Sequence, residues 1–223
     1  MSVAFFDLDR TLISRNSGSM WVRAQLREGR ISLSAAARAL VWLTRYHLGR
    51  SGLDGAVLDA IRTLEGQPEA DLRQRTGAFY DAEVRGLYRP GALAALNEHR
   101  AQGHTLALLT TSSLYMAERV GEALGFHSLL CSRFEVDAQG HFTGRPDGAL
   151  CFGEGKLHHA QALADSLKVS LGDCAFYTDS VTDSPVLEVV GRPVAVNPDP
   201  RLRRLAARKG WAIVDWGEPE RGG

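Results

Sequence analysis

Val3-Ala4-Phe5-Phe6-Asp7-Leu8-Asp9-Arg10-Thr11-Leu12 is an apolar run that ends in two closely spaced carboxylates. The four apolar residues predict a buried strand of a parallel sheet, with Asp7 at its carboxyl end. Ligands of open α/β sheets bind outside the carboxyl ends of the strands. Two carboxylates there are costly unless a cation or a reaction needs them, although Asp and Thr also favour capped turns. From this segment alone, two interpretations are possible: a functional site or a capped turn.

The composition is that of an ordinary globular protein with balanced charge. The chain has 223 residues, of which 44% are hydrophobic, and this suits one domain with an insertion or two small domains. Lys and Arg together number 26, as do Asp and Glu, so the charge gives no support to a nucleic-acid or anionic-membrane partner. No apolar run approaches a membrane span. The cysteines (Cys131, Cys151, Cys174) match neither a disulfide framework nor a CxxC metal pattern, so we expect a cytoplasmic location.

Residues 17–86 have the pattern of helices and contain no convincing strand. Ser17 is predicted to cap the first helix, and Ser32 or Ser34 the second. A break at residues 49–52 precedes a third helix, and a fourth follows. One apolar face of the second helix is expected to contain Leu33, Ala36, Ala37, Leu40, Val41 and Thr44. We interpret this all-helical insert as a cap, because it leaves directly from the acidic loop; the alternative is a separate helical domain.

After residue 89, predicted helices and strands alternate. The helices are expected at residues 92–102, 116–124 and 156–167, with a short one from Pro185 and a basic one after residue 196. The strands are expected at residues 105–109, 174–177, 193–196 and 211–214, and a hairpin at residues 133–136 and 141–143. This order predicts an α/β fold with a Rossmann-like, mainly parallel sheet and an inserted all-helical cap after the first strand.

Three of the predicted strands end in polar clusters: Asp7 and Asp9, the hydroxyl run after residue 109, and Asp179 with Asp183. Parallel strands bring their carboxyl ends to one edge of a sheet. Lys156 lies in the Gly-flanked segment Phe152-Gly153-Glu154-Gly155-Lys156 at a predicted helix start. Each signal alone is weak, because a single lysine is usually a surface residue and hydroxyls often cap helices. Together and in this order they indicate one site.

These residues resemble the motifs of the haloacid-dehalogenase-type phosphohydrolases, and more narrowly of the phosphoserine-phosphatase-like branch (subfamily IB). The four matching motifs are Asp7-x-Asp9-x-Thr11, Leu108-Leu109-Thr110, Gly155-Lys156 and Asp179-Ser180-Val181-Thr182-Asp183. The resemblance covers nearly the whole chain. It implies a catalytic core at residues 1–14 plus 87–223 and a helical cap domain at residues 15–86.

The resemblance also implies how the residues share the chemistry. Asp7 is expected to attack phosphorus and form an aspartyl-phosphate, and Asp9 to act as general acid and then base. Mg²⁺ is the implied cofactor, held by Asp7, the Asp9 backbone carbonyl and Asp179, with Asp183 binding a metal-coordinated water or orienting Lys156. Lys156 is expected to hold the transferring phosphoryl group, whose transfer depends mainly on positioning and charge neutralisation.

The hydroxyl that accompanies Lys156 at the phosphate is expected to be that of Thr110. Thr111 and Ser112 follow directly and are alternatives for the same contact. Phosphoserine phosphatases carry Ser-Gly-Gly at this motif, so this chain departs from them here.

The resemblance does not extend to substrate choice. Phosphoserine phosphatases use a Glu after the nucleophile motif to meet the substrate amino group, and Asn16 occupies that position here. Because Asn carries no charge, the resemblance does not imply that L-phosphoserine is the substrate. The candidate substrate residues are Asn16, Ser17 and Arg23, with ordinary helix start and surface as the alternative.

The predicted function is therefore a Mg²⁺-dependent phosphatase that acts on a small phosphorylated metabolite. Phosphotransfer from the aspartyl-phosphate to an alcohol acceptor is one alternative. A non-catalytic phosphoryl-accepting module is another, but such modules need neither a carboxylate equivalent to Asp9 nor an inserted helical cap.

Overall fold

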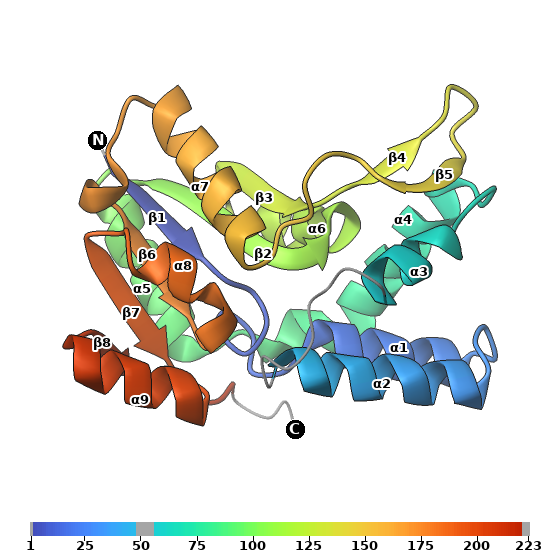
Figure 1. Ribbon diagram of the computed structural model, residues 1–223, viewed down its shortest axis with the longest axis horizontal. Helices are drawn as coiled ribbons and strands as arrows, with labels where there is room; N and C mark the ends of the chain where they lie inside the picture. Colours follow the sequence, from blue (N-terminus) through green and yellow to red (C-terminus); the bar gives the residue numbers. More distant parts are fainter. Residues whose placement is uncertain (1, 48–55, 220–223) are drawn as a thin grey trace.

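A sheet of six parallel strands forms the centre of the protein, with β1 (Val3–Phe6) in its interior. The computed structural model describes residues 2–47 and 56–219. The strand order is β3-β2-β1-β6-β7-β8, and each neighbouring pair runs parallel (Figure 1). The other strands are β2 (Thr105–Ser113), β3 (Ser128–Ser132), β6 (Ala175–Thr178), β7 (Arg192–Val196) and β8 (Ala212–Val214). The carboxyl ends of β1, β2 and β6 are therefore neighbours.

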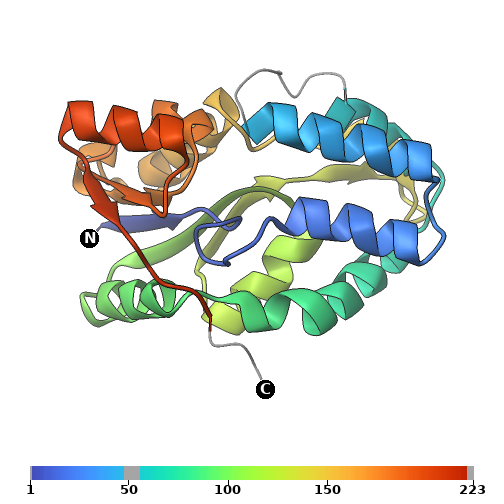
Figure 2. The same ribbon diagram turned by 90° about the horizontal axis from the view of Figure 1, so that it is seen from below.

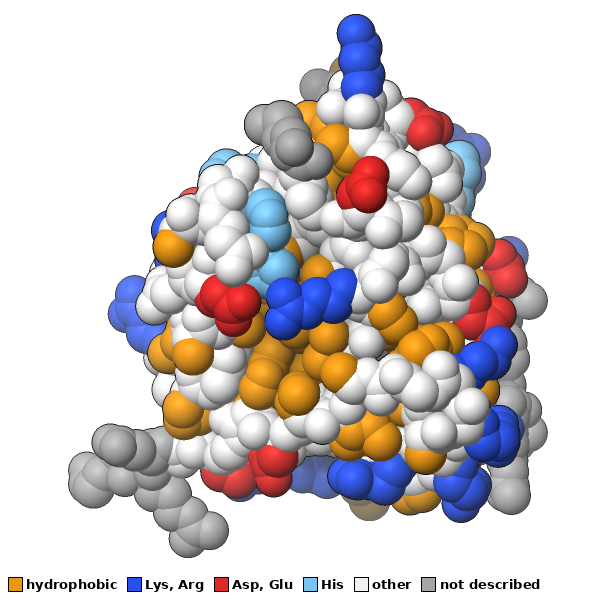
Figure 3. Space-filling model, turned by 90° about the vertical axis from the view of Figure 1, so that its left-hand side faces the viewer, with side chains coloured by type: hydrophobic (Ala, Val, Ile, Leu, Met, Phe, Trp, Pro, Cys, Tyr) orange, Lys and Arg blue, Asp and Glu red, His pale blue; other side chains and the backbone are white. Residues whose placement is uncertain are grey.

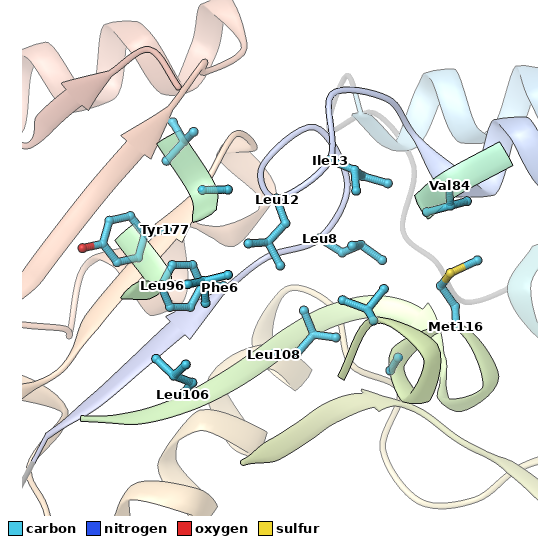
Figure 4. Packing of buried hydrophobic residues seen from close by; sticks show 14 of the residues in the cluster. Phe6, Leu8, Leu12, Ile13, Val84, Leu96, Leu106, Leu108, Met116 and Tyr177 are labelled. Carbon is cyan, nitrogen blue, oxygen red and sulfur yellow. The ribbon is translucent and has the colours of Figure 1, made fainter. Parts of the chain in front are cut away.

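Alternating residues of the central strands pack into two apolar layers, one on each face of the sheet. Phe6 and Leu108 face a layer that includes Leu96 of α5 and Met116 of α6 (Figure 4). The residues that alternate with these along the same strands, Phe5 among them, face α7, α8 and α9 on the other side of the sheet. The period-two alternation of strand side chains thus explains why every residue of β1 is buried. The flanking helices are α5 (Pro90–Ala101), α6 (Leu114–Leu124), α7 (Glu154–Ser166), α8 (Ser184–Leu187) and α9 (Pro200–Lys209).

Helical segments fill the described chain between β1 and α5. They lie beyond the carboxyl edge of the sheet, with α1 and α2 side by side (Figures 1 and 2). The antiparallel hairpin of β4 (Phe134–Val136) and β5 (Phe142–Pro146) lies against them. The Gly66 N–H donates to the Phe142 carbonyl at 2.9 Å, which joins the hairpin to the segment after α3. The segments are α1 (Ser17–Arg27), α2 (Leu33–His47), α3 (Ala56–Arg62), α4 (Glu69–Phe79), the π-helical turn η1 (Tyr80–Val84) and the 3₁₀ turn η2 (Arg85–Leu87).

The predicted fold class is confirmed, namely a mainly parallel Rossmann-like sheet with a helical insertion after the first strand. The division into a core and a cap domain at residues 15–86 stays a prediction. The predicted break at residues 49–52 lies outside the described residues. Two further 3₁₀ turns, η3 (Leu171–Asp173) and η4 (Val181–Asp183), flank β6.

Several local expectations are wrong. The edge strand β3 was not predicted, and β2 runs on to Ser113 instead of ending at Leu109. Asn16, not Ser17, caps α1, because its side-chain oxygen accepts the Ser19 N–H at 2.8 Å. In α2, Ala36 is buried as expected, but Leu33, Ala37, Val41 and Thr44 are exposed.

The face of the molecule away from the inserted helices carries acidic and basic side chains interspersed with apolar ones (Figure 3). This mixture agrees with the zero formal net charge of the chain. In the described ranges, no helix is both long and apolar enough to cross a membrane.

Candidate active site

A buried lysine joins two buried carboxylates at the carboxyl edge of the sheet. Lys156 Nζ donates to Asp7 Oδ1 at 2.7 Å and to Asp183 Oδ2 at 2.8 Å. The Lys156 side chain is 2% exposed, and Asp7 and Asp183 are buried as well. Burying three ionisable groups is costly unless they are paired and hydrogen-bonded, as they are here. The alternative of an ordinary surface lysine is therefore wrong.

The backbone at the start of α7 positions this lysine. Gly153, the residue before the helix, has φ of 49° and ψ of −122°, which favours glycine. A Cβ at Gly155 would overlap the backbone carbonyl of Leu150. The glycines flanking Glu154 thus let the chain turn tightly into α7, and Lys156 reaches Asp7 from the first turn.

The acidic loop after β6 is held by its own hydroxyls. Thr178 Oγ1 donates to Asp183 Oδ2 at 2.6 Å, so this oxygen accepts from both Lys156 and Thr178. The Asp199 carboxylate accepts the Val181 N–H at 2.8 Å and caps α9. Asp183 therefore contacts Lys156 directly, and the two roles expected for Asp183, orienting Lys156 or binding a metal-coordinated water, stay predictions.

Burial raises the pKa of three carboxyl groups of the site. It raises the pKa of Asp7 to about 7, while Lys156 acts against the rise and Asp183 adds to it. Burial also raises the pKa of Asp179 well above its ordinary value, with Asp7 contributing. The pKa of Asp9 is raised by burial too, although hydrogen bonds from Ser17 oppose the shift. Burial without a compensating cation therefore favours the protonated forms of these three groups.

Asp9 lies between the acidic edge and the first inserted helix. Its Oδ1 accepts the Ser17 backbone N–H at 2.5 Å, near the N-terminus of α1. The positive end of the helix dipole and this donor favour the ionised form of Asp9, whereas burial favours the protonated form. Such opposed influences suit a group that both gives and takes a proton.

A cavity of about 200 Å³ opens onto these groups, and Asp7, Asp9, Asp179, Asp183 and Lys156 line it. The structure thus brings together five of the six charged residues predicted for the site; the sixth is Arg23.

The hydroxyl run at the end of β2 is arranged differently from the expectation. Thr111 and Ser112 line the cavity, but Thr110 does not. Thr110 is 1% exposed, and its Oγ1 accepts the Ser112 N–H at 3.1 Å. Thr110 therefore supports the backbone at the end of β2, and the two hydroxyl residues that follow it line the cavity.

The three candidate substrate residues differ in their positions. Asn16 lines the cavity while it caps α1. Ser17 is buried, and its Oγ lies 3.4 Å from Ser112 Oγ at the boundary of a neighbouring cavity. Arg23 is exposed and lines neither cavity, so its place at the substrate stays a prediction without support from this geometry. On an α-helix, six residues correspond to about 600°, which turns Arg23 well away from Ser17.

The sequence did not indicate which apolar residues line the cavity. Trp42 and Leu43 of α2, Phe134 of β4 and Phe152 line the cavity with the charged groups. Tertiary packing brings them there, and a helical or strand pattern alone does not distinguish a cavity-facing aromatic residue from a core residue.

Arg89 was also missed, although it braces the loop that carries the acidic pair. The side chain is 5% exposed, and its Nε donates to the Arg10 carbonyl at 3.2 Å. Its backbone N–H donates to the Leu12 carbonyl at 2.9 Å, and its guanidinium pairs with Glu218 at 2.7 Å. Arg89 thus connects the two ends of the helical insertion with the chain after β8.

The charges of the site fit a hard divalent cation. Four carboxylates line the cavity, and Lys156 is the one Lys or Arg among the described residues that do so. Asp183 Oδ1 is buried without a hydrogen-bond partner in the described part of the chain. Within the same ranges, no three His, Cys, Asp or Glu side chains could hold a metal by themselves. A metal here would need further oxygen donors, and Mg²⁺ accepts backbone carbonyls, water and phosphate oxygens.

Comparisons with known proteins agree with this geometry. A family model described as haloacid dehalogenase-like hydrolase matches residues 4–188. The chain is 30% identical to the Inhibition of morphological differentiation protein of Streptomyces azureus, over 99% of this chain and 80% of that protein. It is also 30% identical to the phosphoserine phosphatase SerB1 of Mycobacterium tuberculosis, over 96% of this chain and 71% of that one. A crystal structure of a protein with unknown function from Bordetella pertussis Tohama I has a TM-score of 0.86 and 30% identity, covering 97% of this chain and 99% of that chain.

Proposed function

This chain belongs to the haloacid dehalogenase-like hydrolase family, in its phosphoserine-phosphatase-like branch, and from this premise we propose that it is a Mg²⁺-dependent phosphatase acting through an aspartyl-phosphate on Asp7. The observation that carries the proposal is the buried contact of Lys156 with Asp7 and Asp183. A lysine held this way offers its positive charge at the carboxylate that would attack. A phosphomonoester is a dianion, so its approach to Asp7 needs that charge.

In the first step, an Asp7 carboxylate oxygen attacks phosphorus as the bond from phosphorus to the ester oxygen breaks. Asp9 gives its proton to the departing oxygen, which leaves as an alcohol. The raised pKa of Asp9 favours the protonated form that this step requires. Lys156, with the hydroxyls of Thr111 and Ser112, stabilises the charge on the transferring group. Thr110 stays a proposed phosphate contact, since its hydroxyl can donate while it accepts the Ser112 N–H, but it would have to turn toward the cavity that it does not line here.

In the second step, Asp9 takes a proton from water as the water oxygen attacks phosphorus. The bond between phosphorus and Asp7 breaks, which frees the carboxylate and releases inorganic phosphate. Bound Mg²⁺, held by the carboxylates of Asp7 and Asp179 and the Asp9 carbonyl, would neutralise charge on the phosphoryl oxygens. Asp183 keeps Lys156 oriented through both steps.

The test is phosphate release from a panel of phosphomonoesters, with Mg²⁺ and with EDTA, for wild type and Asp7→Asn. We expect metal-dependent release that Asp7→Asn lowers by at least about 1,000-fold while circular dichroism shows the same fold. Turnover of Asp7→Asn near that of wild type would remove Asp7 as the nucleophile. Consumption of the ester with phosphate appearing on an alcohol instead of in solution would favour phosphotransfer.

A small phosphorylated metabolite remains the proposed substrate, and the cytoplasm remains the proposed location. The three cysteines support the location, because all are buried and none forms a disulfide in the described chain.

A further inference from the structure

A second and larger cavity lies beside the site. It has a volume of about 810 Å³, within the range of pockets that hold small organic ligands. Its wall shares Gly18, Val57, Ser112 and Phe134 with the cavity over the carboxylates. A phosphoryl group at Asp7 would therefore have space beside it for a substantial organic group.

Most of this chamber is apolar. Its lining residues come mainly from α1, α3, α4 and α6, with others from α2, the end of β2 and the start of the hairpin. Figure 1 shows where these elements lie in the fold. Trp21 packs edge-on against Phe79, which holds the indole in place on the chamber wall. The apolar lining includes Trp21, Val22, Ile31, Ile61, Leu64, Leu72, Met116 and Phe134. Such a wall favours an apolar leaving group and gives a small polar one few partners.

The charged residues of the chamber are all basic. Arg30 and Arg75 line it, and none of its described lining residues is Asp or Glu. Arg75 is half-buried and is held by oxygens of uncharged groups: Gln25 Oε1 at 3.4 Å, Gln67 Oε1 at 3.3 Å and the Asp71 carbonyl at 3.2 Å. Burial lowers the pKa of Arg75, and nearby Arg30 adds to the shift, while the more distant charges of Asp71 and Glu28 oppose it.

Arg73, two residues earlier on the same helix, has carboxylate partners where Arg75 has neutral ones. Its guanidinium pairs with the carboxylates of Glu69 and Glu118. Arg75 has no carboxylate oxygen within 4 Å among the described residues, although both arginines belong to α4. A guanidinium presented to a cavity by neutral acceptors keeps its capacity to bind an anion.

We propose that the chamber binds the organic group of the substrate, and that this group has a bulky apolar body ending in an anion that Arg75 meets. This inference rests on the proposed phosphatase function. An ammonium-bearing leaving group finds no carboxylate among the described lining residues. Arg75 repels it, whereas the charge of Arg30 is paired with Glu28 at 2.9 Å. Asn16, which caps α1, supplies no counter-charge either.

The test uses three aryl phosphates that share one phenyl ring and differ in the para substituent: carboxyethyl, its neutral amide, or aminoethyl. We expect kcat/KM to fall in that order, with the carboxylate favoured over the amide by about ten- to hundredfold. In Arg75→Gln, kcat/KM for the carboxylate should fall to within about threefold of that for the amide. Arg75→Lys should keep part of the preference, because the charge remains.

Arg73→Gln is the matched control, since it removes a guanidinium from the same helix outside the chamber, and it should keep the wild-type order. Equal kcat/KM for the three esters in wild type, or an unchanged preference in folded Arg75→Gln, would overturn the inference. Faster turnover of L-phosphoserine than of the carboxyethyl ester would overturn it as well. Those results leave the phosphatase function standing, whereas a lack of Mg²⁺-dependent release from every ester would refute that function instead.

Discussion

Replacing Gly155 with alanine tests whether the start of α7 sets the position of Lys156. The new Cβ would lie well inside 3.0 Å of the Leu150 carbonyl oxygen, a separation that real Cβ atoms essentially never show. Either the helix start or the preceding loop must move by about 1 Å, at a cost of roughly 1–3 kcal/mol. The bonds from Lys156 to Asp7 and Asp183, at 2.7 and 2.8 Å, would then exceed hydrogen-bonding distance.

A displacement of this size at a catalytic group lowers activity by about 100-fold. We therefore expect Gly155→Ala to lose about 100-fold in kcat/KM for an aryl phosphate and to melt several degrees lower. Gly86→Ala is the control, because no atom lies within 4 Å of its added Cβ and its φ is not positive. A Gly155→Ala variant with activity within threefold of wild type and an unchanged Tm would refute this account of the helix start.

Three other predictions concern the metal, pH and packing. Mg²⁺ should raise the Tm of wild type in differential scanning fluorimetry but leave that of Asp179→Asn unmoved; equal shifts would exclude Asp179 as a ligand. Burial lowers the pKa of His99 to about 4, so the unfolded state binds more protons below pH 6.5 and stability is lost as the pH falls toward 4. In urea unfolding, His99 should lower the free energy of unfolding by about 2 kcal/mol at pH 5 relative to pH 7. If His99→Gln shows the same pH dependence of stability as wild type, this prediction is wrong. Gly91→Ala places a Cβ into the Trp216 side chain, so it should lower Tm by several degrees while kcat stays within twofold; an unchanged Tm would count against the packing described.

The sequence was sufficient to predict the fold because its strongest patterns are local. The uninterrupted apolar run of β1 has one reasonable interpretation, and the alternation of helices and strands after Pro90 specifies a parallel sheet. β3 was missed because Ser128–Ser132 has only two strongly apolar residues before Cys131. As an edge strand, it depends on pairing with β2 more than on its own pattern.

The site was predictable in its charges but not in its hydroxyls. Asp7 and Lys156 are fixed by the end of one strand and the start of one helix. The direction of Thr110 depends on where β2 ends, and its pairing with β3 becomes irregular between Leu109 and Ser113. A shift by one residue exchanges the two faces of a strand, so a run of four hydroxyls does not reveal which one faces the cavity.

The chamber itself could not have been predicted. Arg75 looks like any surface arginine of a polar helix, and its neighbour Arg73 is one that pairs with carboxylates. Only the packing of α1, α3 and α4 distinguishes them, and the sequence pattern contains no information about that packing.

Chemical trapping of the aspartyl-phosphate tests the central claim most directly. Wild-type protein would be quenched during turnover of an aryl phosphate with Mg²⁺, reduced with borohydride, and its N-terminal peptide analysed by mass spectrometry. Reduction of an aspartyl-phosphate converts the aspartate to homoserine, so the account predicts homoserine at residue 7 and none at Asp9. Turnover without any modified Asp7, or with homoserine at residue 9 instead, would contradict the account.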